Sequence, residues 1–324
     1  IADEMAPHLP DRTLALEESA RDALVDCGLT EIITYSLGTL ESEARLSVGA
    51  PMPDASRYLR VANPLSRETE YLRQTLMASM LEAVGRNLRF VERVAAFEIG
   101  RIFLRQEGQA FPSEPTRLCI ALTGPREQRS WLAKERSSMD YYDLKGIIEA
   151  LCRHLGIKKA TFVPGQHTAL HPGRSAAMLV GGQPIGVLGE LHPAVRQQFE
   201  LPDQTICLAE LDMDALIAAA EPVVQHRPIS RMPALKLDLA LVVDESVPAD
   251  QVESTIRESG GAMLVEVVLF DVYRGQQLGA GKKSLAYSLT FQSPDKTLTS
   301  EQAVQQRDRI VRTLQRTHGA EIRG

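Results

Sequence analysis

Strict alternation of apolar and polar residues predicts a strand over residues 284–291, near the end of the chain. Alternate residues of a strand point to opposite sides, so one side of this strand faces a core and the other faces water. Residues 269–273 form a second run of strand type, separated from the first by a glycine-rich connection. The two runs are therefore expected to pair as neighbouring strands. The predicted core side of the later strand carries Leu285, Tyr287, Leu289 and Phe291, and its open side carries Ser284, Ala286, Ser288 and Thr290.

The earlier of the two strands carries the most informative side chains. Asp271 and Tyr273 are two residues apart and must share a face. If Phe270 and Val272 fill the core, that face is the open one. An acceptor carboxylate beside an exposed aromatic ring suits a ligand that stacks and donates hydrogen bonds, which is typical of a platform for single-stranded nucleic acid. Three cations suited to phosphate lie nearby in the sequence: Arg274, Lys282 and Lys283.

The elements around this pair complete a small domain. An alternating run over residues 235–243 predicts a strand, and Pro248 is well placed to begin the helix that follows. Thr299 or Ser300 is a suitable N-cap for a last helix, and residues 320–322 allow a short final strand. The order βαββαβ predicts a ferredoxin-like sandwich with both helices on one face.

The longer first part of the chain predicts an α+β domain built on an antiparallel sheet. Many short runs of strand type, among them residues 32–36, alternate with few helices. The stretch 223–233 contains proline and is expected to be a linker. The predicted domains are therefore residues 1–222 and 234–324. The clearest helical periodicity covers residues 12–27, 72–88 and 142–155.

Charge and composition limit the class of partner. The net charge is −6, of which the first 226 residues carry −7 and the remainder +1. Non-specific binding to nucleic acid requires many Lys and Arg side chains against phosphates, so any RNA contact should be local and DNA binding is not expected. The chain has no apolar run long enough for a membrane span and no secretory pattern, which favours a cytoplasmic protein. Because it begins at Ile1, we expect it to be part of a longer protein.

Three phrases of the second domain resemble a known family. Residues 230–243, 269–275 and 281–286 are similar to the ferredoxin-fold anticodon-binding domain that closes the β subunit of bacterial phenylalanyl-tRNA synthetase. The resemblance implies that this domain contacts the anticodon of tRNA(Phe), with Asp271, Tyr273 and Ser284 at its contact positions. The residues alone leave a simpler interpretation open, in which Asp271 caps a turn and Tyr273 packs locally.

Phrases in the first domain resemble the catalytic-like domain of the same subunit, so the resemblance covers nearly the whole chain. It implies a degenerate class II synthetase core that packs on the catalytic α subunit within an α2β2 enzyme. It also implies that ATP and Mg²⁺ are used by other parts of that enzyme, and that the editing domain lies outside this chain. The matching phrases are residues 34–36, 63–66, 72–73, 97–100, 143–146 and 189–193.

The residues at the expected active-site positions agree with a synthetase core that has lost its active site. A class II site needs Arg-x-Glu on the strand after a phrase such as residues 97–100, because the arginine neutralises charge on the ATP phosphates. Leu104 and Gln106 stand at those positions. Arg105 and Glu107, one place along, would face the other side of a strand. We therefore expect no catalytic residue and no bound cofactor in this chain.

A metal site has little support in the sequence. The four cysteines are far apart and are expected to be reduced thiols. Residues 170–173 form a turn sequence, so helical spacing does not apply to the histidines around them and no metal site is expected. The side chains that suggest such a site are His167, His171, Glu190 and His192.

Two interpretations other than RNA binding remain. The chain could be a stand-alone protein that binds a small molecule on its open sheet. It could also be a structural module for subunit assembly, without tRNA contact. Three arginines, expected on one helix face, would lie either in solvent or against the α subunit: Arg86, Arg89 and Arg93.

Overall fold

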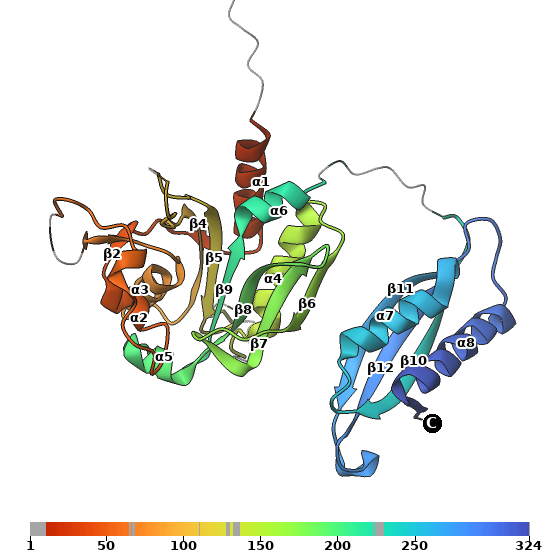
Figure 1. Ribbon diagram of the computed structural model, residues 1–324. Coiled ribbons are helices and arrows are strands. Elements are labelled where there is room, and N and C mark those ends of the chain that lie inside the picture. The colour runs from red at the N-terminus through yellow and green to blue at the C-terminus, as the bar shows by residue number, and fades with distance from the viewer. Residues whose placement is uncertain are drawn as a thin grey trace, which may run out of the picture. The chain divides into compact units, whose positions relative to one another are not determined.

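The computed structural model describes residues 11–64, 66, 69–109, 111–127, 130–131, 137–221, 223 and 230–323. The chain divides into two compact units, residues 1–224 and 225–324, which are described separately (Figure 1). Most of the predicted linker, residues 224–229, lies outside the described residues.

A seven-stranded sheet forms the centre of the first unit. All neighbouring strands pair antiparallel except β1 and β4, which pair parallel. This confirms the predicted α+β domain on an antiparallel sheet. In spatial order the strands are β1 (Thr30–Glu31), β4 (Val94–Arg101), β5 (Thr116–Thr123), β9 (Ile206–Asp212), β8 (Gln183–Leu191), β7 (Leu170–Val180) and β6 (Ala160–Pro164).

Helices bury both faces of this sheet. Helices α1 (Arg12–Asp26), α4 (Tyr141–His154) and α6 (Met213–Ala219) pack on one face. Helices α3 (Met77–Asn87) and α5 (Pro193–Gln198) pack on the other. Strand β5 shows the consequence, because Leu118, Ile120 and Leu122 join the first core while Cys119 and Ala121 join the second.

The edge of this unit beside α3 is less regular. It holds α2 (Leu40–Ala44), the short pair β2 (Leu37–Gly38) and β3 (Tyr71–Leu72), and the 3-10 turn η1 (Ala55–Arg57). The predicted strand over residues 32–36 is wrong. After β1, the backbone of Thr34 donates to the carboxylate of Glu98 instead of a strand ladder.

The second unit has the predicted βαββαβ order. Its four strands form one antiparallel sheet in the order β11-β12-β10-β13. Two short 3-10 turns, η3 (Gly261–Met263) and η4 (Gln276–Leu278), join the larger elements. Those are β10 (Leu235–Asp244), α7 (Ala249–Gly260), β11 (Leu264–Tyr273), β12 (Lys282–Phe291), α8 (Ser300–His318) and β13 (Glu321–Ile322).

Both helices of this unit cover the same side of its sheet. Thr299 and Gln302 form a capping box at the start of α8, and Gly319 ends it with a left-handed φ of 62°. Apolar side chains of α7 and α8 form one core with those of β10 and β12, in which Tyr287 is fully buried and its hydroxyl donates to the carbonyl of Ala249. In the described part of this unit no helix lies on the opposite side, which we call the open face.

A β-bulge in β11 corrects one expectation. Leu269 pairs with Tyr287 and Asp271 pairs with Ala286, so Phe270 is an extra residue between them. Phe270 is 57% exposed, and its predicted place in the core is wrong. Val272 does turn toward the core side, opposite Leu285, but β11 is an edge strand and Val272 remains 41% exposed.

Candidate nucleic-acid interface

Strand pairing brings Asp271, Tyr273 and Ser284 to the same side of the sheet, the open face, where Ser284 is only 3% exposed. Tyr273 lies directly opposite Ser284, and Asp271 lies opposite Ala286 in the neighbouring row. Directly opposed residues of an antiparallel pair point to the same side. Ala286 is in turn opposite Ala240 of β10, so small side chains separate Asp271 from the far edge of the sheet. The arrangement is a flat surface bordered by an aromatic ring and an exposed carboxylate.

The Tyr273 ring is half-buried, because two groups contact it. The guanidinium carbon of Arg323 lies 4.9 Å from the ring centroid, in a cation–π contact. The ring also lies against the backbone of Gly275, where any Cβ would collide with it. Sequence reasoning missed Arg323, which follows Tyr273 by 50 residues. Only the strand order β11-β12-β10-β13 brings the two close.

The three cations predicted to meet phosphate all have partners within the domain. Arg274 pairs with Glu245 at 2.8 Å, and its hydrogen bond lowers the pKa of that carboxyl group. Lys282 pairs with Glu321 at 2.9 Å, which raises the pKa of the lysine.

Lys283 is the clearest departure from expectation. It lies opposite Val243, on the helix-covered side, and is only 7% exposed. Its ammonium group donates to the carbonyl of Glu245 at 2.9 Å. This geometry argues against a phosphate contact by Lys283.

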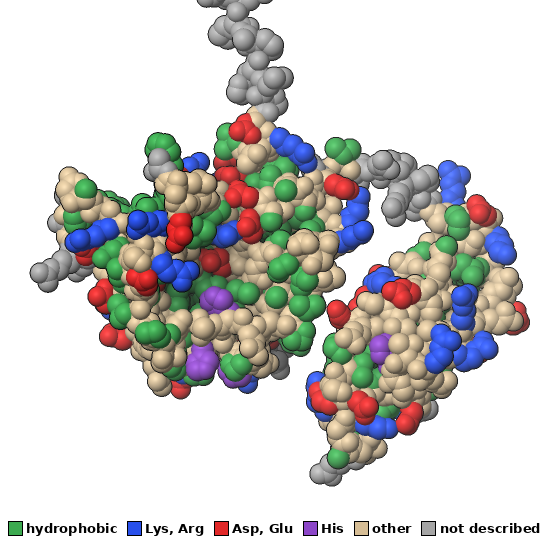
Figure 2. Space-filling view, viewed as in Figure 1, with side chains coloured by type: hydrophobic (Ala, Val, Ile, Leu, Met, Phe, Trp, Pro, Cys, Tyr) green, Lys and Arg blue, Asp and Glu red, His purple; other side chains and the backbone are tan. Residues whose placement is uncertain are grey.

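Helix α8 offers a second basic surface. In Figure 2, Lys and Arg side chains gather over α8, which carries Arg307, Arg309, Arg312 and Arg316. The helix contains no Phe, Tyr or Trp, and its histidine, His318, is hydrogen-bonded to the Thr255 hydroxyl, so it is better suited to attract phosphate than to stack a base. The open face is therefore the better candidate for contact with unpaired bases.

In the first unit, three of the phrases shared with the synthetase family meet at one buried ion pair. Arg73 and Glu98 lie 2.9 Å apart, with side chains only 8% and 2% exposed. The Thr34 hydroxyl donates to Glu98 at 2.6 Å, and Arg73 also donates to the carbonyl of Arg101. A Cβ at Gly100 would collide with the Arg73 guanidinium, which explains the glycine. The phrases therefore specify a structural network.

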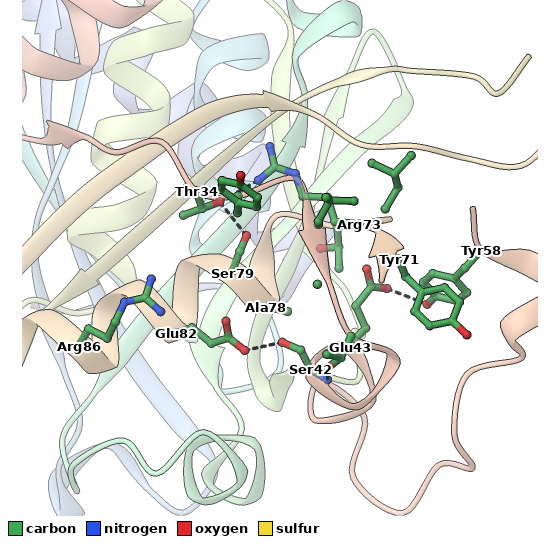
Figure 3. Close-up of a pocket in the computed structure, with 16 residues that line it drawn as sticks. Thr34, Ser42, Glu43, Tyr58, Tyr71, Arg73, Ala78, Ser79, Glu82 and Arg86 are labelled. Carbon is green, nitrogen blue, oxygen red and sulfur yellow. Dashed lines mark hydrogen bonds between the residues drawn. The ribbon is translucent and has the colours of Figure 1, made fainter. Parts of the chain in front are cut away.

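A small cavity of about 130 Å³ lies next to this network (Figure 3). The Glu43 carboxylate in its wall accepts from the Tyr58 hydroxyl at 2.7 Å, and burial raises the pKa of Glu43. Glu82 accepts from the Ser42 hydroxyl. Ligand pockets usually enclose about 300–1,000 Å³. This cavity lies below that range and its carboxylates are already paired, so it is not a favourable ligand pocket.

The positions of the missing Arg-x-Glu lie beyond β4. Leu104 bridges to Ser113 and packs against the core beneath α3. Arg105 donates to the carbonyl of Ser56 at 2.8 Å. An aliphatic side chain at position 104 cannot neutralise phosphate charge.

The histidines near β7 and β8 stabilise turns. The Nδ1 atoms of His167, His171 and His192 each accept a backbone N–H two residues later, at 3.1–3.2 Å. Glu190 instead pairs with Arg174 at 2.6 Å. Among the described residues no group of three His, Cys, Asp or Glu side chains is arranged to hold a metal ion.

Two further findings concern helices. Helix α3 ends at Asn87, so Arg89 and Arg93 lie beyond it, and the predicted single helix face with Arg86 is wrong. Within the described ranges, none of the helices has the length and apolar character needed to span a bilayer.

Comparisons with known proteins match both units. Residues 3–213 match the family described as phenylalanyl tRNA synthetase beta chain CLM domain, and residues 230–323 match the ferredoxin-fold anticodon binding domain. The phenylalanine–tRNA ligase β subunit of Symbiobacterium thermophilum is 40% identical over 306 residues, which are 94% of this chain and 34% of that relative. The β subunit of Bacillus subtilis is 34% identical over 312 residues, 96% of this chain and 38% of the relative. The chain thus spans well under half the length of these relatives.

A solved structure supports the fold of the first unit. Pyrrolysyl-tRNA synthetase from Desulfitobacterium hafniense matches with a TM-score of 0.50 and 16% identity, over 63% of this chain and 68% of that chain. At this identity the likeness concerns the fold alone, which is the class II synthetase-like architecture expected from the sequence.

Proposed function

The chain belongs to the phenylalanyl-tRNA synthetase β-chain family, and from this premise we propose that its second unit binds the anticodon of tRNA(Phe) on the open face. One observation carries the proposal: Asp271, Tyr273 and Ser284 lie on adjacent rows of that face. A tyrosine ring can stack on an unpaired base, and a carboxylate can accept from the Watson–Crick edge of guanine. Both groups lie where an unpaired loop can approach without displacing a helix.

The first unit has a supporting role in this proposal. It packs on a catalytic α subunit within an α2β2 phenylalanine–tRNA ligase of the cytoplasm, and it binds neither ATP nor Mg²⁺ itself. The buried Arg73–Glu98 pair and the aliphatic Leu104 support this assignment, since neither leaves a free cation for a phosphate. The whole enzyme charges tRNA(Phe) with phenylalanine through its other parts.

Selective binding to the anticodon tests the proposed function. The full chain is titrated with a tRNA(Phe) anticodon stem-loop and with the same stem-loop carrying a different anticodon, at about 150 mM salt. We expect the native loop to bind at least about tenfold tighter, since one wrong base costs about 1–3 kcal/mol in specific complexes. Equal affinities, or no binding, would favour a structural role in subunit assembly instead.

A further inference from the structure

Arg323 occupies an unusual position on the open face. It follows β13, and its backbone N–H donates to the carbonyl of Ala240 at 3.0 Å, which extends the ladder along β10. Its guanidinium lies over the Tyr273 ring. Within the part of the chain that the structure describes, Arg323 has no carboxylate partner, in contrast to Arg274 and Lys282.

The surroundings of Arg323 form a small platform. One row runs across the sheet from Arg323 on one edge to Asp271 on the other, and only two alanine methyl groups lie between them: Ala240 and Ala286. The outer strands are about 14 Å apart, since adjacent strands lie about 4.8 Å apart. Tyr273 borders the platform from the next row. Only the backbone of Arg323 lies at the far edge, because its guanidinium lies over the Tyr273 ring. A flat base therefore meets an apolar floor, the Asp271 carboxylate and the guanidinium held on the tyrosine ring.

The contact with Tyr273 leaves the donor groups of Arg323 available. A cation–π contact needs only the charge of the guanidinium over the ring, so the N–H groups that do not face the ring stay able to donate to another partner. The aromatic ring thus holds the arginine in place without satisfying its donors. Such an arginine is suited to acceptor atoms of RNA, which are phosphate oxygens or the O6 and N7 atoms of guanine.

We infer that Arg323 is an RNA-binding residue of the open face, held by Tyr273 so that its N–H groups meet acceptor atoms of a bound single-stranded loop. The inference rests on the proposed function and adds a residue to it. It replaces Lys283, whose ammonium is buried against Glu245, as the basic group of the site.

Variants of Arg323 test the inference against a matched control. The full chain, Arg323→Ala and Arg257→Ala are titrated with the native tRNA(Phe) anticodon stem-loop. Both substitutions remove one arginine from the same unit, but Arg257 lies on helix α7 and pairs with Glu253 at 2.7 Å. We expect Arg323→Ala to weaken binding roughly 10- to 100-fold, as for a lost hydrogen bond from a charged group. Arg257→Ala should stay within about twofold, as for a cation already in a surface ion pair.

Salt dependence identifies the acceptor. If Arg323 meets a phosphate, Arg323→Ala should reduce the slope of log affinity against log salt by about 0.7. If it meets a base edge, affinity should fall with an unchanged slope, and replacing guanine in the loop by 7-deazaguanine should weaken the wild type but not the variant. Either result supports the inference.

The failures of the inference and of the proposed function are distinguishable. If the wild type binds the native loop selectively and Arg323→Ala binds equally well, Arg323 only anchors the last strand and the inference is wrong. An equal loss in Arg257→Ala would also overturn it, because the effect would then be general charge. If the wild type shows no selective binding, the proposed function itself is wrong. Thermal unfolding of each variant identifies a titration temperature at which all are folded. Arg323→Lys keeps the charge but lacks the planar fork of the guanidinium, so it should still bind more weakly than the wild type.

Discussion

Replacing Glu98 with alanine is expected to lower the free energy of unfolding of the first unit by about 3–5 kcal/mol, because it leaves the buried Arg73 guanidinium without its carboxylate. The Thr34 hydroxyl loses its acceptor at the same time. Differential scanning calorimetry is the suitable measurement, since a chain of two units can show two transitions. For a unit of this size the transition should fall by roughly 6–20 °C, while the transition of the second unit stays in place.

Two controls separate the buried pair from ordinary surface charge. Glu82→Ala removes a carboxylate that is 34% exposed and paired with Arg45, and it should cost at most about 1 kcal/mol. The double variant Arg73→Met/Glu98→Met should recover part of the loss, because it buries no unpaired charge. A loss below about 1 kcal/mol in Glu98→Ala would show that the pair does not hold the unit together.

Replacing Tyr273 with alanine is expected to weaken binding of the tRNA(Phe) anticodon stem-loop by about 1–3 kcal/mol, the usual loss for one base–aromatic stack. The substitution also removes the ring that positions Arg323. Tyr273→Phe keeps the ring and should retain most of the affinity. Isothermal titration calorimetry with the full chain measures the differences directly.

A matched tyrosine provides the control for this prediction. Tyr142 in the first unit is 76% exposed, and Tyr142→Ala should leave the affinity for the stem-loop unchanged. If Tyr273→Ala binds as tightly as the wild type, the ring takes no part in the interface. If both alanine variants lose affinity, the RNA contacts more of the chain than the open face.

Alternation in the sequence was enough to predict the βαββαβ unit and the shared face of Asp271 and Tyr273. It placed Phe270 wrongly, because a bulge inserts a residue without interrupting an apolar run. The apolar residues 269, 270 and 272 allow two phases of alternation, and only pairing with β12 selects Leu269 and Val272 as the core-facing residues. Local patterns were therefore enough to predict the elements. The placement of Phe270 depends on long-range pairing between strands.

Closeness in sequence was a poor guide to which cations lie at the site. Lys283 is adjacent to Ser284, yet strand alternation sends it to the opposite side. Arg323 is distant in sequence, yet β13 places it beside Tyr273. In the first unit, likewise, the family phrases around Thr34, Arg73 and Glu98 were recognisable separately, but their meeting at one ion pair depends on the fold. No local sequence pattern predicts these long-range contacts.

Hydroxyl-radical footprinting of the full chain, free and bound to the tRNA(Phe) anticodon stem-loop, tests most directly whether RNA lies on the open face. We predict that oxidation of Tyr273 and Phe270 falls on binding, while Phe90 and Trp131, exposed side chains of the first unit, react as before. Unchanged oxidation of Tyr273, with protection confined to peptides of α8, would place the RNA on the basic helix surface and contradict the account.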